Sequence, residues 1–141
     1  MAKIIYNDII PWKGCKLITI WPFVFARNGV KLTDEDANHE SVHLYQQFEM
    51  LVASAVLIAA LILLFDLSWW WMLLAPLVYF IWYITEYTIR LFLYGNHKEA
   101  YRNIATEQEA YQNEKNFDYL RKERKPFAWV KYLTRKTYKR N

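Results

Sequence analysis

A long stretch with almost no charge constrains this chain more than any other feature. Between Glu49 and Glu86 the only charged residue is Asp66, although 23% of the 141 residues are charged. Two apolar runs fill this stretch, residues 51–65 and 69–84, and only a short turn separates them. Such runs lack the polar face that a helix of a soluble protein needs. The sequence therefore predicts a mainly α-helical membrane protein with a two-helix transmembrane hairpin.

The first run continues a polar helix, and together they form residues 33–65. Thr33 fits an N-cap with an acid three residues later, and no Pro or Gly follows before Pro76. We expect one helix from Asp34 to Phe65, about 48 Å long at 1.5 Å per residue, whose second half is the first span.

The second run belongs to residues 66–94, which we expect to form the turn and the second span. Ser68 can cap a helix over residues 69–94, in which Pro76 is a kink. The flanking ends of the hairpin carry many Lys and Arg, whereas the turn carries none. The positive-inside rule then places both termini in the cytoplasm.

The N-terminal residues 1–32 read as a β-hairpin. Residues 3–10 and 16–26 are rich in β-branched and aromatic side chains, and residues 11–14 between them contain Pro and Gly, as a turn requires. With Cys15 as the only cysteine, no internal disulfide can form.

After the hairpin we expect a third, amphipathic helix over residues 98–124, within a segment 95–125, and then a basic amphipathic tail, 126–141. Nine of the last 21 residues are Lys or Arg. This basic tail is expected to lie on the anionic lipid headgroups of the inner leaflet. No stacking platform or nucleic-acid reader motif accompanies it, so nucleic acid is not an expected partner. A two-helix membrane unit this small also favours a homo-oligomer.

An HExxH motif lies in the polar half of the first helix, from His39 to His43 with Glu40 between them. Residues four apart share one face of a helix, so both imidazoles can bind one Zn²⁺ ion. Glu40 can then act as the general base toward an activated water. The alternative is a pair of histidines and an acid on a solvated helix face.

A catalytic zinc needs a third protein ligand, and the third helix offers Glu107 and Glu109. They are two residues apart and point to roughly opposite faces, so only one can be a ligand. Glu107 shares a face with the apolar Ile104 and Tyr111, which favours Glu107. A zincin-like site completed by this helix is the resulting prediction.

These residues resemble a known family. His39 to Gln46 is similar to the HExxHxxQ signature, and residues 107–111 are similar to the ExEA block of gluzincin-type metallopeptidases. With the two-helix insert, residues 33–115 resemble small two-pass membrane proteins of the bacterial inner membrane. The resemblance implies His39, His43 and Glu107 as zinc ligands and Glu40 as general base.

The resemblance leaves the third ligand open. Gluzincins often have Asp or Asn four residues after the ligand Glu. Tyr111 stands at that distance from Glu107, whereas Asn113 stands at that distance from Glu109. Glu109 is therefore the alternative ligand.

The predicted activity is hydrolysis of an amide in a peptide or protein substrate. Tyr111 is a candidate catalytic donor to the oxyanion, with Tyr101 and His97 as other candidates. His43 precedes Leu51 by eight residues, about 12 Å of helix, which favours a juxtamembrane or cytoplasmic peptide. Strand 16–26 could hold that peptide by edge pairing. The alternative is a non-catalytic membrane protein whose zinc site is structural or vestigial, acting as a scaffold or sensor.

Overall fold

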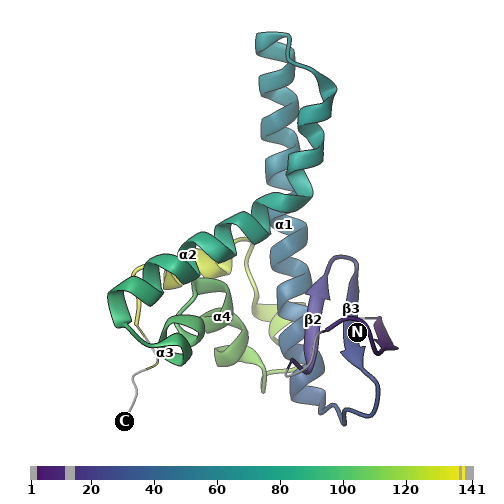
Figure 1. The fold of residues 1–141 in the computed structure, drawn as a ribbon, viewed down its shortest axis with the longest axis vertical. Helices are drawn as coiled ribbons and strands as arrows, with labels where there is room; N and C mark the ends of the chain where they lie inside the picture. Colours follow the sequence, from purple (N-terminus) through teal and green to yellow (C-terminus); the bar gives the residue numbers. More distant parts are fainter. Residues whose placement is uncertain (1–2, 12–14, 137, 139–141) are drawn as a thin grey trace.

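The molecule consists of a helical hairpin that rises from a smaller mixed base (Figure 1). The computed structural model describes residues 3–11, 15–136 and 138. Helix α1 (Asp34–Phe65) runs the full height, and a 3₁₀ helix, η1 (Trp69–Leu77), returns beside its upper half. Helix α2 (Val78–Tyr94) then turns away from α1 and extends over the base (Figure 1). The fold is thus mainly helical, as predicted.

Helix α1 confirms the predicted first helix at both ends. The Thr33 hydroxyl accepts the backbone N–H of Asp36, and the Asp36 carboxylate accepts the backbone N–H of Thr33, which is a complete capping box. Asp66 ends the helix in a left-handed conformation. One uninterrupted helix therefore connects the HExxH motif with the apolar hairpin.

The second predicted helix begins and ends where expected but has two parts. Ser68 accepts the backbone N–H of Trp70 at the start, and Gly95 ends the helix with a φ of 63°. Pro76 lies inside η1, and regular α-helix begins only after it, at Val78. Because Pro has no N–H, Pro76 cannot make the hydrogen bond of a regular α-helix, and the 3₁₀ segment η1 changes to the α-helix α2 just after it.

The predicted N-terminal hairpin of residues 1–32 is wrong in its pairing. The structure has three strands, β1 (Ile4–Asn7), β2 (Leu17–Ile20) and β3 (Phe23–Arg27), in the order β1-β3-β2. β1 pairs in parallel with β3, and the run 16–26 is itself a hairpin of β2 and β3 that turns at Trp21 and Pro22. The expected turn at 11–14 falls mainly outside the described residues.

The predicted single third helix is also wrong, because it is divided into three pieces. These are α3 (His97–Arg102), α4 (Ala105–Asn113) and a π-helical turn, η2 (Tyr119–Glu123). Between α3 and α4 the buried amide of Asn103 donates to the carbonyl of Glu99. Ile104 has extended backbone and is fully buried. Packing of Ile104 into the core outweighs the helix propensity of the segment.

The basic tail buries two of its aromatic residues. A 3₁₀ turn, η3 (Ala128–Tyr132), buries Trp129 and Tyr132 in a core cluster with Met50, Tyr79 and Ala105. These two side chains complete the protein core, whereas Phe127 is exposed, and contact of the tail with lipid stays a prediction. Residues 137 and 139–141 of the predicted tail lie outside the described part of the chain.

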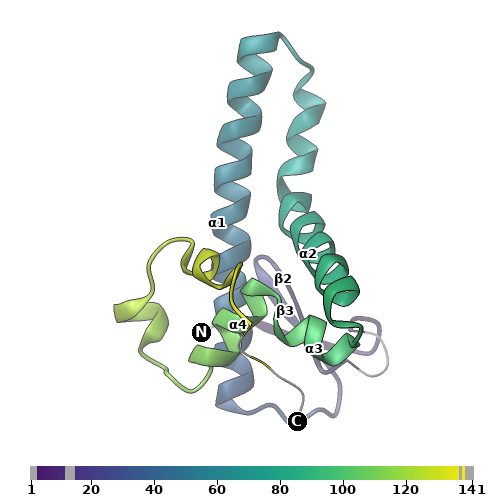
Figure 2. The same ribbon diagram turned by 90° about the vertical axis from the view of Figure 1, so that its left-hand side faces the viewer.

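The upper hairpin, unlike the base, exposes most of its large apolar side chains. The helical stretches Asp34–Phe65 and Trp69–Tyr94 are long and apolar enough to cross a membrane. Their large apolar side chains are mostly exposed; Leu64, for example, is 76% exposed and Trp70 78%. The packed core therefore lies in the base, around the lower half of α1 (Figure 2).

Candidate metal centre

Helix α1 presents His39 and His43 to the interior of the base. The two side chains are four residues apart, share one face of the helix and are both buried. Their Nε2 atoms are 3.2 Å apart, and the rings meet edge to face. Two potential nitrogen ligands therefore converge on one point.

Glu107 reaches the same point from α4. Its Oε2 is 3.5 Å from His39 Nε2, and its Oε1 is 3.5 Å from His43 Nε2. Oε1 also accepts the hydroxyl of Tyr83 at 2.8 Å, whereas Oε2 is buried without a hydrogen bond. One ligand atom from each of these three residues lies within 4.8 Å of the others, so the group could hold a metal ion.

Polar contacts on the far side of each ring orient both Nε2 atoms toward the cluster. The Gln46 amide donates through Nε2 to the carboxylate of Glu109, so its Oε1 is the atom that faces His43 Nδ1, at 2.8 Å. His39 Nδ1 lies 3.1 Å from a carboxylate oxygen of Glu114. Each Nδ1 therefore lies against an oxygen atom, and each Nε2 faces the other ring and the Glu107 carboxylate.

The spacing of these atoms fits zinc. Ligands bound to Zn²⁺ at about 2.0–2.1 Å in a tetrahedron are about 3.3 Å apart. Here the two Nε2 atoms are 3.2 Å apart, and each lies 3.5 Å from a different oxygen of Glu107. Two imidazoles and one carboxylate are also a donor set found at catalytic zinc sites, where the fourth position stays open.

The electrostatics of the group favour a positive charge at its centre. Burial alone lowers the pKa of His43, but the adjacent Glu107 carboxylate raises that pKa to about 9. Burial alone raises the pKa of Glu107, but the imidazoles of His43 and His39 hold it well below its usual range. Glu107 is therefore ionised throughout the physiological pH range.

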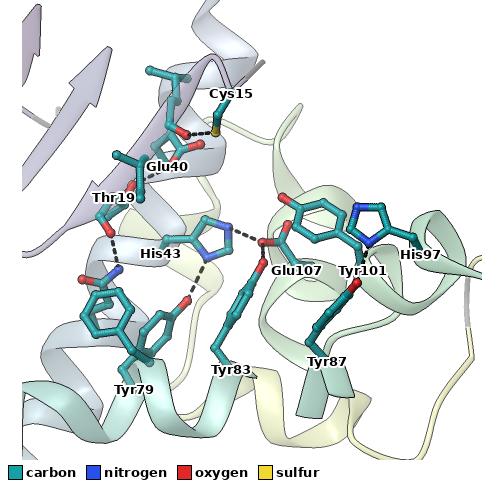
Figure 3. A pocket seen from close by; sticks show the side chains of 14 residues that line it. Cys15, Thr19, Glu40, His43, Tyr79, Tyr83, Tyr87, His97, Tyr101 and Glu107 are labelled. Carbon is teal, nitrogen blue, oxygen red and sulfur yellow. Dashed lines mark hydrogen bonds and ion pairs between the residues drawn. The ribbon is translucent and has the colours of Figure 1, made fainter. Parts of the chain in front are cut away.

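Glu40 follows His39 on α1 and faces a neighbouring cavity of about 390 Å³ (Figure 3). The buried hydroxyl of Thr19, on β2, donates to its carboxylate. His43 and Glu107 line the same cavity. The expected general base and two of the expected ligands therefore share one space.

The outer edge of β2 borders this cavity. Leu17, Ile18 and Thr19 all line it, although consecutive residues of a strand point to opposite faces. β3 covers the other edge of β2. The amide of Gln47 bonds both the carbonyl of Thr19 and the N–H of Trp21, as a neighbouring strand would.

The three candidate oxyanion donors occupy different places. Tyr101 and His97 line the cavity, and His97 Nδ1 is 2.5 Å from the hydroxyl of Tyr87. Tyr111 instead packs edge to face on His39, with ring centroids 4.6 Å apart. The catalytic role of Tyr111 stays a prediction, and its observed contact is with a candidate ligand.

Glu109 does not join the cluster. It is completely buried and accepts hydrogen bonds from Tyr119 at 2.9 Å, Arg124 at 2.7 Å and Gln46 at 3.0 Å. The structure therefore brings Glu107, and not the alternative Glu109, to the two histidines.

Other polar side chains on α1 have mixed outcomes. Gln46 contacts an imidazole, whereas Gln47 bonds β2 and Glu49 bonds Arg124. Farther along the chain, Glu86 and Arg90 form a buried ion pair at 2.7 Å.

The sequence analysis did not identify three residues that contact the site. Glu114 contacts His39 Nδ1, Thr19 donates to Glu40, and Tyr83 donates to Glu107. Glu114 follows Glu107 by seven residues, two helical turns, so its spacing was a usable signal. Thr19 and Tyr83 come from elements distant in sequence, and nothing in the local pattern identifies them.

The comparisons with known proteins add no identity: no family model, curated protein or solved structure matches the chain.

Proposed function

We propose that this chain is a membrane-embedded, zinc-dependent metallopeptidase. The observation that carries the proposal is the convergence of His39 Nε2, His43 Nε2 and the Glu107 carboxylate beside a cavity, with one ligand atom from each residue within 4.8 Å of the others. A catalytic zinc keeps its fourth coordination position open for water or substrate, and the cavity leaves room for that position. A structural zinc site has four protein ligands and needs no such cavity. This favours a catalytic role over a scaffold or sensor.

The proposed mechanism assigns a role to each group around the cavity. Bound zinc would supply a Lewis acid for the substrate carbonyl and for water. Glu40 accepts a proton from the attacking water and passes it to the leaving amine, and Thr19 holds the Glu40 carboxylate in place. Tyr101 and His97, which line the same cavity, would donate to the oxyanion.

Membrane embedding is the second part of the proposal. The two long apolar helical stretches support a hairpin that crosses the inner membrane twice, with the base and both termini on the cytoplasmic side. Peptide or protein substrates would then meet the site at the cytoplasmic surface of the bilayer.

The test compares the full chain with Glu40→Gln, both purified in detergent and loaded with zinc. A peptide mixture from a digested proteome serves as substrate, and mass spectrometry counts the new N-termini. We expect both proteins to bind zinc but only the unsubstituted chain to cleave. Equal cleavage by the two proteins, or none by either, would contradict the proposal. His39→Ala, which we expect to lose zinc as well as cleavage, separates loss of the metal from loss of the base.

A further inference from the structure

The cavity beside the candidate metal centre has mainly apolar and aromatic walls. Helix α2 contributes Tyr79, Tyr83 and Tyr87, which reach toward the site from one side (Figure 3), and Phe80 also lines the cavity. Strand β2 faces them with Leu17 and Ile18 among its lining residues. A ligand that fills this space must therefore be largely apolar, with one polar group near the metal centre.

The helix that forms the aromatic wall is itself apolar on its outer side. Phe92 and Leu93 are 86% and 71% exposed, and Ile81, Ile84 and Ile89 are each more than half exposed. A single helix therefore separates the cavity from an exposed apolar surface, which is continuous along the chain with η1 and the hairpin (Figure 1).

The opposite wall also carries exposed apolar side chains. Ile20, at the end of β2, and Trp21, in the turn after it, are exposed, and Trp21 stacks on the exposed ring of Phe48 with centroids 5.6 Å apart. Phe48 precedes the apolar run at Leu51 by less than one helical turn. Trp and Phe at the end of an apolar run are typical of a membrane interface.

From these two walls we infer the substrate class of the proposed metallopeptidase, so this step depends on the proposed function. We propose that the cavity takes an extended, apolar juxtamembrane segment of a membrane-anchored protein, which enters between β2 and α2 from the bilayer interface. The segment lies along the edge of β2 at Leu17–Thr19, where three consecutive residues border the cavity. Gln47 already bonds the carbonyl of Thr19 and the N–H of Trp21, so the segment ends at Thr19 on that side.

The experiment uses the zinc-loaded Glu40→Gln chain in phosphatidylcholine nanodiscs, because this variant is expected to bind without cleaving. Three synthetic peptides carry a photo-crosslinking residue: an apolar segment joined to a transmembrane helix, the same segment without the helix, and a Gly/Ser segment joined to the helix. Mass spectrometry measures the yield and position of crosslinking. We expect the anchored apolar peptide to crosslink to β2 and α2 at least about tenfold more than either control.

A matched pair of substitutions in the sheet locates the binding. Ile18→Trp fills the cavity, whereas Tyr6→Trp places the same side chain at an exposed position of β1. We expect Ile18→Trp to reduce crosslinking about tenfold or more and Tyr6→Trp to leave it unchanged. Equal crosslinking of all three peptides, or equal effects of the two substitutions, would overturn the inference.

Zinc content, measured on the same samples, distinguishes the two levels of failure. If zinc does not bind, the proposed function fails. If zinc binds and the peptides are not discriminated, the proposed function stands and the substrate class is wrong.

Discussion

Helix α4 carries two buried carboxylates whose surroundings differ completely. Glu109, on one side, meets only donors: a guanidinium, a phenol and an amide. Glu107, on the other side, meets one phenol and the Nε2 atoms of two imidazoles, and its Oε2 has no hydrogen bond. Two acids separated by one residue therefore belong to different groups: Glu109 to an ion-pair network and Glu107 to the cluster with His39 and His43.

The difference shows what a buried charge needs. An ionised carboxylate in a protein interior is tolerated only when a counter-charge and hydrogen bonds compensate for lost hydration. Arg124 supplies this for Glu109, and for Glu49 as well. The neighbours of Glu107 are instead two imidazoles and the phenol of Tyr83. The Glu109 side of α4 thus belongs to an ion-pair network, whereas the Glu107 side is a group that could hold a metal ion.

The largest expected effect on stability comes from removing the counter-charge of Glu109. Arg124→Met leaves Glu109 and Glu49 buried without their counter-charge, and we expect the free energy of unfolding to fall by about 3–5 kcal/mol. Chemical unfolding in detergent measures the loss. Lys122→Met is the control, because the ion pair of Lys122 with Asp118 is exposed and should contribute less than about 1 kcal/mol. Equal losses in both variants would refute the distinction.

The second test separates the two carboxylates by their metal affinity. Glu107→Gln removes a proposed ligand, and we expect zinc to bind more than about a hundredfold more weakly, a larger loss than removal of an outer-shell partner causes. Glu109→Gln, in molecules that remain folded, should still bind one zinc per chain. Zinc titration against a competing chelator measures both. If Glu109→Gln weakened zinc binding and Glu107→Gln did not, Glu109 would be the ligand and the assignment of the two carboxylates would be wrong.

A smaller effect is expected from the groups that hold the ligands. Glu114→Gln weakens the acceptor at His39 Nδ1, and we expect zinc affinity to fall about tenfold with one zinc still bound at saturation. The same chelator competition measures it, with the exposed Glu123→Gln as control. If both variants bind zinc equally well, Glu114 does not support His39.

The smallest effect on stability is expected from the hydrogen bonds that join α1 to the end of α4 away from the metal centre. The Asn38 amide donates to the carbonyls of Asn113, Glu114 and Asn116 at the end of α4. We expect Asn38→Ala to lower the free energy of unfolding by about 1 kcal/mol. Chemical unfolding tests this, and a loss as large as that of Arg124→Met would mean that the ion pairs are not the main support of the base.

Much of this arrangement could be predicted from local patterns. The capping box at Thr33, the unbroken helix to Phe65 and the i, i+4 spacing of His39 and His43 are properties of adjacent residues. The choice of Glu107 over Glu109 followed from an apolar stripe, although all of α4 from Ala105 to Ala110 is buried and no simple stripe exists.

The remaining features depend on contacts between distant segments. β1 pairs with β3 rather than with β2, and strand propensity contains no information on partner choice. Ile104 interrupts a helix-forming segment because its side chain fits the core. Trp129 and Tyr132 form part of that core, yet their spacing among lysines looks the same as that of a lipid-binding tail.

The most direct test of the central claim is X-ray absorption at the zinc edge, measured on the full chain in detergent after equilibration with zinc. We predict about one zinc per chain, with two imidazoles and oxygen ligands at about 2.0–2.1 Å and no sulfur. A protein that takes up no zinc, or a zinc without imidazole ligands, would contradict the assignment of the Glu107 side of α4 as a metal centre.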